Sequence, residues 1–355
     1  MSKLPIKQRS SNFELLRIVS MVMVVIMHVL RHGGVLQALT VGSLKYWVLW
    51  GMESLSFVGV NCYLLLTGYF QVQAQFSWKK VVSLVLQLMF YAALSEVILV
   101  AMTGELKLDD LLSVIDPVGK NVYWFATQYL ILYVASPYIN QMIATLSKEA
   151  HKRLAILLVV MWGLYPTIAF WAKNTFSLGN NIMWFITVYV AAAYFRLYDI
   201  KMSMRTSVVG YLVCAAILLL SRFVLDKAGV LLNISSDLGK FMFYNNSPVV
   251  FASSVFVFMI FKQIDAQKLP FRKAINLIAS LCFGVYLIHD SEILRADLWE
   301  IIRINMHANI RLPLLIAKVI IVVVGIFICG CTMEYIRRAI GNCFVCLFKK
   351  DKTRI

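Results

Sequence analysis

Two ionisable residues lie within the first membrane-length apolar segment, which reads FELLRIVSMVMVVIMHVL over 13–30. Arg17 and His28 are separated by eleven positions, or about 16 Å along a helix. Ionisable side chains are costly in the hydrocarbon layer, so those found there commonly serve a function. The imidazole of His28 titrates near neutral pH and suits general-base work, whereas the guanidinium of Arg17 matches the geometry of a phosphate group.

Both residues also have purely structural interpretations. Arg17 could extend its charged end to the membrane surface and only anchor the helix there. His28 could form a hydrogen bond between helices without taking part in chemistry. The remainder of the chain must therefore show whether the two residues act together.

The composition predicts a membrane protein. The 355 residues are 61% hydrophobic, with a mean hydropathy of +0.77, whereas soluble domains contain about 45–50% apolar residues. Apolar runs recur from end to end, so we expect an all-α polytopic integral membrane protein. We expect one membrane-embedded domain over 1–355, with no fused soluble domain and membrane lipid around it. The net charge of +16 falls in short loops, as topology signals do, which argues against nucleic acid as a partner.

Hydropathy and length predict about ten transmembrane helices. The expected spans are 13–31, 46–70, 81–103, 122–142, 154–172, 182–198, 207–225, 247–262, 275–290 and 313–336. Most of the 34 Lys and Arg residues lie in the termini and the even-numbered connections, whereas acidic residues gather in the odd-numbered ones. The positive-inside rule then places both termini in the cytoplasm. The first span therefore runs outward from Arg17 to His28.

In this topology four further ionisable residues share the outer depth of His28. They are Glu53 in the second span, Glu96 in the third, and His289 and Asp290 at the end of the ninth. A carboxylate beside a histidine fixes its tautomer and supports general-base catalysis. Glu53 lies at about the depth of His28, so we expect the catalytic pair to be His28 and Glu53.

This pair would deprotonate a hydroxyl that arrives from outside. Arg17, near the inner face, would bind a phosphorylated donor that arrives from the cytoplasm. Structural ion pairing remains the alternative for Glu53 and for Glu96. An interfacial role is favoured over catalysis for His289, because it lies close to the membrane edge.

The cysteines do not indicate a metal site. Most of the seven lie within apolar segments, where a free cysteine behaves as a small hydrophobe. Cys343 and Cys346 form a single CxxC without the second pair that a zinc site would need. We therefore expect no metal.

Four segments resemble the membrane-bound acyltransferase 3 family of bacterial surface-sugar O-acyltransferases. The first is the pair Arg17 and His28, ten residues between them, preceded by Glu-Leu-Leu. The segment GVNCYLLLTGYF at 59–70 is similar to one that closes in Ser/Thr-Gly-Tyr/Phe. YWFATQYLILYVASPYIN at 123–140 resembles a Trp-Phe…Tyr…Pro…Asn pattern, and FGVYLIHD at 283–290 a Gly-x-Tyr-Leu-x-His ending. All four occur in the family's order and spacing.

The resemblance implies an O-acetyltransferase in the bacterial plasma (inner) membrane. Its donor would be cytoplasmic acetyl-CoA, and its acceptor a hydroxyl of a capsule, O-antigen or other surface polysaccharide, or of a lipid-linked precursor. His28 would be the essential histidine, as base or transient acyl acceptor, and Arg17 would help to position the donor. The residues at other motif positions, and Glu96 at the outer depth, would line or support the site: Asn61, Tyr69, Glu96, Trp124, Tyr129, Tyr286 and His289.

Two adjacent positions depart from the family pattern. Many members carry Asp-Gly before the Leu-Arg of the first span, whereas this chain has Glu14 and Leu15 there. This difference indicates a sub-branch of the family.

A second class of function fits the same residues. A glycan flippase, polymerase or proton-coupled transporter also needs buried His, Glu and Arg along its pathway. The chain shows no internal repeat and no helices broken by Pro or Gly in the middle of the membrane, and this favours acyl transfer over transport.

Overall fold

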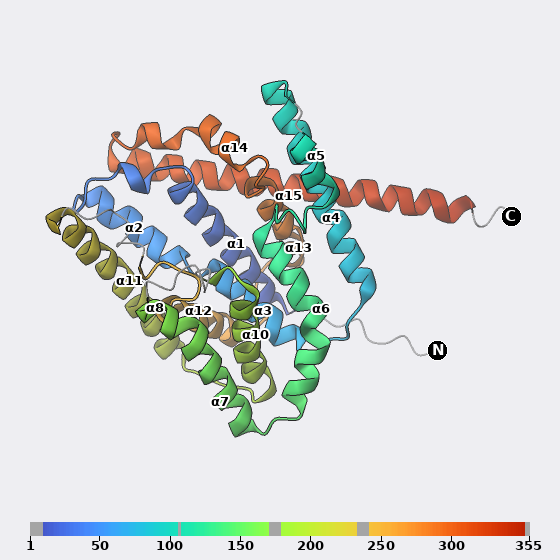
Figure 1. Ribbon diagram of the computed structural model, residues 1–355, viewed down its shortest axis with the longest axis horizontal. Coiled ribbons are helices and arrows are strands. Elements are labelled where there is room, and N and C mark those ends of the chain that lie inside the picture. The colour runs from blue at the N-terminus through green and yellow to red at the C-terminus, as the bar shows by residue number, and fades with distance from the viewer. Residues whose placement is uncertain (1–9, 106–107, 170–178, 233–240, 352–355) are drawn as a thin grey trace.

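In the computed structural model, helices surround α1 in a bundle, and the long helix α15 crosses one side of it (Figure 1). The structure describes residues 10–105, 108–169, 179–232 and 241–351, and this part of the chain contains no β-strand. The helices are α1 (Ser11–Arg31), α2 (Leu44–Ser56), α3 (Gly59–Gln71), α4 (Trp78–Thr103), α5 (Leu108–Ile115), α6 (Trp124–Ala144), α7 (Lys148–Val159), α8 (Tyr165–Ile168), α10 (Ile182–Leu197), α11 (Met204–Leu232), α12 (Pro248–Gln263), α13 (Arg272–His289), α14 (Arg295–Ile302) and α15 (Leu312–Asp351).

Helix α1 lies at the centre of the bundle. It packs against α2, α3, α12, α13 and α15. Most of its residues are apolar, and Leu16, Val25 and Leu30 are fully buried, as expected for a helix enclosed by others. The polar residues of α1 therefore meet side chains from several other helices.

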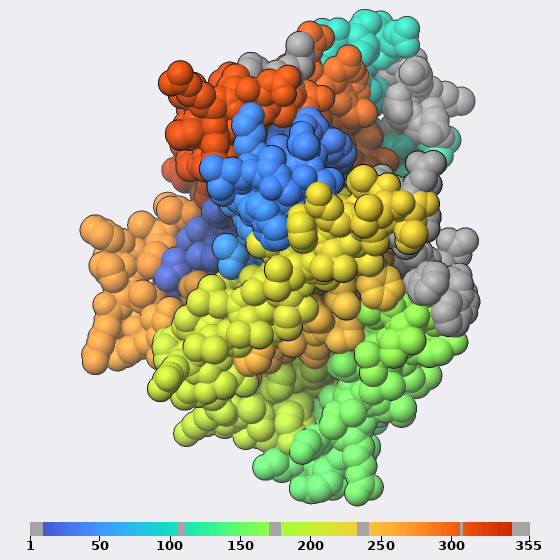
Figure 2. Space-filling view, turned by 90° about the vertical axis from the view of Figure 1, so that its left-hand side faces the viewer, coloured from blue at the N-terminus to red at the C-terminus, as the bar shows by residue number. Residues whose placement is uncertain are grey.

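The outer surface carries a large amount of apolar side chain. Figure 2 shows α11 (yellow-green to yellow) lying diagonally across one face, and its exposed residues include Val209, Leu212 and Val224. Soluble proteins rarely expose apolar patches of this extent. Five helical regions are long and apolar enough to cross a membrane: Ser11–Arg31, Leu44–Gln71, Trp78–Thr103, Met204–Leu232 and Leu312–Asn342. The chain is therefore an all-helical membrane protein.

Each of the ten expected spans coincides with a helix or with consecutive helices. The crossing of the membrane by all ten, and the cytoplasmic position of both termini, stay predictions. The end of the expected span 154–172 lies outside the described residues. The described part of that span is interrupted by a π-helical turn at Val160–Leu164 between α7 and α8.

The second expected span, 46–70, consists of two helices. Helix α2 ends at Ser56, and α3 begins at Gly59. A Cβ atom at Gly59 would lie 2.8 Å from the carbonyl oxygen of Ser20 and 2.8 Å from the Val24 side chain, both on α1. Only glycine permits this close approach of α3 to α1. The break thus lets α3 pack directly on the central helix.

Candidate active site

Arg17 and His28, the two candidate residues of α1, line two different cavities near opposite ends of that helix. His28 lines a cavity of about 390 Å³, here called the histidine cavity, together with Arg31, His32, Asp290 and Arg295. Its remaining lining residues are Met21, Val24, Met27, Phe57, Val60, Tyr63, Trp124, Phe125, Asn180, Phe243, Tyr244, Asn245, Phe283 and Tyr286. Apolar and aromatic walls with a few polar groups are typical of binding sites for small molecules.

A chain of hydrogen bonds fixes the tautomer of His28. His289 Nδ1 lies 2.5 Å from the carbonyl oxygen of Val285, which can only accept, so Nδ1 carries the hydrogen. The Nε2 atom of a neutral His289 is then an acceptor. It lies 2.9 Å from His28 Nδ1, which must therefore donate. The lone pair of neutral His28 consequently resides on Nε2, which makes this atom the basic nitrogen of a side chain that lines the cavity.

The carboxylate nearest to His28 belongs to Asp290. Its Oδ1 atom lies 3.8 Å from His28 Nδ1 and 3.3 Å from Arg295 Nη1. The Asp290 side chain is almost completely buried, and its Oδ2 atom has no hydrogen-bond partner in the described part of the chain. A negative charge at this distance stabilises the imidazolium that forms when Nε2 accepts a proton.

Glu53 was expected beside His28, but its recorded partner is Arg31. The Glu53 carboxylate is fully buried and forms an ion pair with Arg31 Nε. The Arg31 guanidinium also lies over the rings of Phe57 and Phe243, at 4.4 and 5.6 Å from their centroids. Glu53 thus fixes the Arg31 guanidinium in the wall of the histidine cavity. The carboxylate beside His28 is that of Asp290, not that of Glu53.

Arg17 lines a second cavity of about 780 Å³, here called the arginine cavity. Its Nη1 atom donates to Glu14 Oε2 at 2.9 Å, and about a third of the side chain is exposed. Three more cations, Lys79, Lys80 and Arg338, line the same cavity. Its other lining residues are Ser10, Tyr63, Leu66, Thr67, Phe70, Gln71, Ala74, Ser83, Leu84, Gln87, Phe125, Tyr129, Tyr133, Ala279, Ser280 and Phe283. Cations thus outnumber the carboxylate of Glu14, and such a cavity favours an anionic ligand.

The two cavities meet at an aromatic junction made of Tyr63, Phe125 and Phe283, which line both of them. The Tyr63 hydroxyl donates to the backbone carbonyl of Arg17 at 2.9 Å. Its ring contacts Phe125 edge-on, with 6.3 Å between the centroids. These three side chains therefore lie between the two cavities.

The other residues expected to line the site have different positions. Trp124 and Tyr286 line the histidine cavity, and Tyr129 lines the arginine cavity. His289, expected to be interfacial, is buried in direct contact with His28.

Three of the expected lining residues line neither cavity. Asn61 is buried, accepts from Trp184 Nε1 at 3.0 Å and donates to the Asn245 carbonyl at 2.7 Å. Tyr69 packs among Phe13, Phe70 and Phe258. Glu96 is buried in α4. Asn61 thus supports the cavity wall through Asn245, whereas Tyr69 packs among aromatic rings and accepts a hydrogen bond from Arg196 at 3.4 Å.

A group of possible metal ligands was not expected from the sequence. His28, His32 and Asp290 each offer one ligand atom, and these atoms lie within 4.8 Å of one another. Imidazole and carboxylate ligands suit a divalent ion such as Zn²⁺. The side chains of Cys343 and Cys346, which carry the CxxC motif, lie outside the described residues.

A comparison with protein families identifies the chain. A family model described as an acyltransferase domain matches residues 10–333, which include both cavities' motif residues. The chain belongs to the acyltransferase 3 family. No curated protein and no solved structure matches it.

In this acyltransferase, the sequence prediction missed several charged or polar residues of the cavities, among them Arg31, His32, Arg295 and Arg338. Arg31 ends the first expected span and His32 directly follows it, and Arg295 follows the His289–Asp290 pair by five residues. Their positions at the ends of the spans that carry the candidate catalytic residues were a usable signal. Arg338 offered no such signal, because it resembles an ordinary topology-setting cation at the end of the last span.

Proposed function

We propose that this acyltransferase is an O-acetyltransferase. It moves an acetyl group from cytoplasmic acetyl-CoA to a hydroxyl of a cell-surface polysaccharide or of its lipid-linked precursor. The observation that carries this proposal is the pair of cavities that meet at the aromatic junction, one with a basic histidine and the other with a surplus of cations.

Each cavity binds one of the two substrates. The phosphate groups of acetyl-CoA occupy the arginine cavity, and its thioester end extends through the junction towards His28. The acceptor hydroxyl enters the histidine cavity, where aromatic residues and the amides of Asn180 and Asn245 contact the sugar. A multi-pass position in the bacterial plasma membrane, with both termini in the cytoplasm, lets the two substrates arrive from opposite sides.

The reaction proceeds by direct transfer with His28 as general base. The acceptor oxygen attacks the thioester carbonyl carbon while His28 Nε2 removes the hydroxyl proton. The C–S bond then breaks, the acetyl group stays on the acceptor oxygen, and the CoA sulfur leaves with the proton that His28 returns. His289 keeps Nε2 available, and Asp290 stabilises the imidazolium. General-base catalysis of this kind contributes about 10²–10⁴-fold to a rate.

The test is an analysis of the surface polysaccharide of the host by mass spectrometry. Deletion of the gene is expected to remove an acetyl substituent while the polymer itself remains. The wild-type gene restores the substituent, whereas a gene carrying His28→Ala does not, although the variant accumulates to the same level in the membrane. Loss of the whole polymer after deletion would instead support a flippase, polymerase or transporter. Restored acetylation by the His28→Ala gene would overturn the role of His28.

A further inference from the structure

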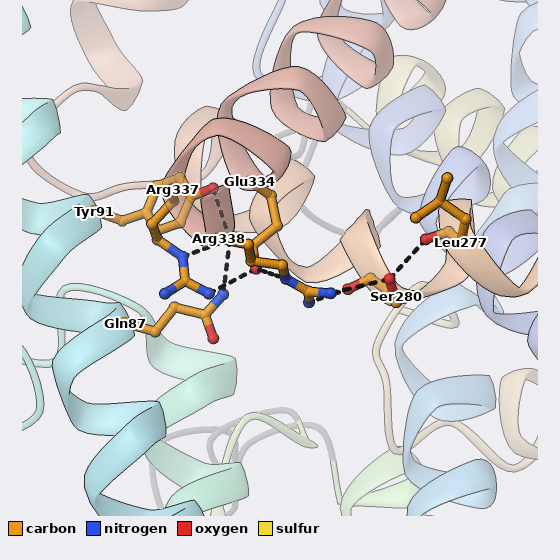
Figure 3. Close-up of polar contacts among 7 residues, drawn as sticks. All are labelled: Gln87, Tyr91, Leu277, Ser280, Glu334, Arg337 and Arg338. Atoms are coloured by element: carbon orange, nitrogen blue, oxygen red, sulfur yellow. Dashed lines mark hydrogen bonds and ion pairs between the residues drawn. The ribbon is translucent and has the colours of Figure 1, made fainter. Parts of the chain in front are cut away.

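A buried carboxylate near the end of the chain collects five hydrogen bonds (Figure 3). Glu334 Oε1 accepts from Arg337 Nη2 and from Arg338 Nε, both at 2.7 Å. Its Oε2 atom accepts from Arg337 Nε at 2.8 Å and from Gln87 and Tyr91 of α4, both at 3.1 Å. Glu334 therefore links α15 to α4 and fixes the orientation of two arginines.

The second arginine is held on its other side by α13. Arg338 Nη1 donates to Ser280 Oγ at 3.0 Å, and Nη2 donates to the Ser280 carbonyl at 2.5 Å. The Ser280 hydroxyl itself donates to the Leu277 carbonyl at 2.7 Å, so its oxygen accepts from Arg338. These contacts use three of the five N–H donors of the guanidinium. The other two remain on a side chain that is 41% exposed and lines the arginine cavity.

The charges around the arginine cavity leave Arg338 able to bind an anion. Glu14 is paired with Arg17, whereas the single carboxylate of Glu334 is shared between Arg337 and Arg338. The Glu334 cluster therefore keeps one net positive charge. A guanidinium held in a fixed orientation, with two N–H groups to spare, matches the geometry of a phosphate group.

This cluster is not part of the matched family segment. The family model ends at residue 333, directly before Glu334. The four segments that resemble the family also exclude Glu334, Arg337 and Arg338. A role for these residues thus follows from their contacts in this chain.

We propose that Arg338 binds a phosphate group of the nucleotide part of the donor, and that Glu334 is the positioning residue that orients Arg338. The identity of the donor as acetyl-CoA rests on the proposed function. Donor binding then uses two walls of the arginine cavity, with Arg17 on α1 and Arg338 on α15.

A comparison of two acetyl donors, one with phosphate groups and one without the nucleotide, separates phosphate recognition from the acetyl-transfer step. Arg338→Gln should raise the KM for acetyl-CoA by roughly tenfold or more, the usual effect of losing hydrogen bonds to a charged group. The KM for S-acetylpantetheine, which lacks the nucleotide, should not change, and kcat should stay within about twofold. The matched control is Arg272→Gln, which removes an exposed arginine that lines neither cavity. Equal effects of Arg338→Gln on both donors would overturn the proposal.

Glu334→Gln tests orientation against simple charge. This change removes a negative charge near the cavity, so simple electrostatics would tighten the binding of an anion. Loss of orientation would weaken it, because the amide cannot hold the guanidiniums as the carboxylate does. We expect a raised KM for acetyl-CoA, and a lowered or unchanged KM would contradict the role of Glu334. Arg338→Lys keeps the charge without the planar fork and should give a KM between those of the wild type and Arg338→Gln.

Direct binding keeps this proposal separate from the proposed function. The affinity of the purified protein in detergent for CoA should fall by roughly tenfold in Arg338→Gln, measured by isothermal titration calorimetry. If the wild type binds CoA through Arg338 but transfers no acetyl group, the proposed function fails and this proposal stands. If acetyl transfer is intact and Arg338→Gln changes neither CoA affinity nor KM, this proposal fails alone. Size-exclusion profiles matching the wild type show that each variant is folded.

Discussion

At the scale of single residues, the main feature of the site is a histidine oriented by another histidine. His289 receives its own orientation from a backbone carbonyl of the same helix, so the basic nitrogen of His28 is defined without a direct carboxylate hydrogen bond. Asp290 then supplies charge at 3.8 Å. The position of the hydrogen atoms follows from the acceptor-only nature of a carbonyl oxygen. A pair of variants at one position tests this relay.

We expect His289→Gln to retain much more activity than His289→Leu. The amide oxygen of glutamine can accept from His28 Nδ1, and its NH₂ group can donate to the Val285 carbonyl, whereas leucine can do neither. Loss of the correct tautomer should lower the rate of acetyl transfer in His289→Leu by about 10²-fold or more. The measurement is the initial rate with acetyl-CoA in proteoliposomes. Equal rates in the two variants would show that His289 only fills space.

At the scale of elements, the contact of α1 with α3 determines how the site is enclosed. The break between α2 and α3 brings Gly59 against the backbone of α1 and places Val60 and Tyr63 in the cavity walls. The aromatic junction thus depends on the close packing of α3 on α1. A larger side chain at this contact should therefore lower the stability of the whole bundle.

Gly59→Ala is expected to destabilise the protein by about 1–3 kcal/mol, the usual cost of overpacking. Its added Cβ atom would lie 2.8 Å from both a carbonyl oxygen and a valine side chain of α1. The matched control is Gly325→Ala on α15, where a Cβ atom meets nothing within 4 Å. Thermal unfolding in detergent should show a lower Tm for Gly59→Ala and an unchanged or higher Tm for Gly325→Ala. An unchanged Tm in both would contradict the tight packing of α3 on α1.

At the scale of the whole molecule, the two cavities make the two ends of the helix bundle different from each other. The arginine cavity lies at the N-terminal end of α1 and the histidine cavity at its C-terminal end. Ligands of the two cavities can therefore approach from opposite ends of this helix. The distribution of Lys and Arg predicts that the arginine cavity faces the cytoplasm.

This orientation predicts which segments are accessible from outside the cell. Epitope tags at both termini should be protected from a membrane-impermeant reagent in intact spheroplasts and labelled after permeabilisation. A tag inserted after Gly104, between α4 and α5, should be labelled in both cases. External labelling of either terminus would invert the orientation and place the cation-lined cavity away from cytoplasmic acetyl-CoA.

The helices and the ends of α1 at which Arg17 and His28 lie could be predicted from the sequence. Helical hydrogen bonds connect residues four apart, so hydropathy, length and spacing along the chain decide where helices run. The same local information placed His28, Glu53, His289 and Asp290 at a common depth. It could not show which of them touch.

Only the tertiary structure showed which side chains of the site contact one another. His28 meets His289 and Asp290, which lie more than 260 residues away in the sequence, whereas Glu53 turns to Arg31. Arg338 likewise joins Arg17 in one cavity through the packing of α15 on α13. Such contacts depend on how side chains of separate helices fit together, and spacing along one helix does not encode that fit. The sequence therefore determined the family, the helices and the first candidate catalytic residue, while helix packing determined the charge beside the histidine and the second wall of the arginine cavity.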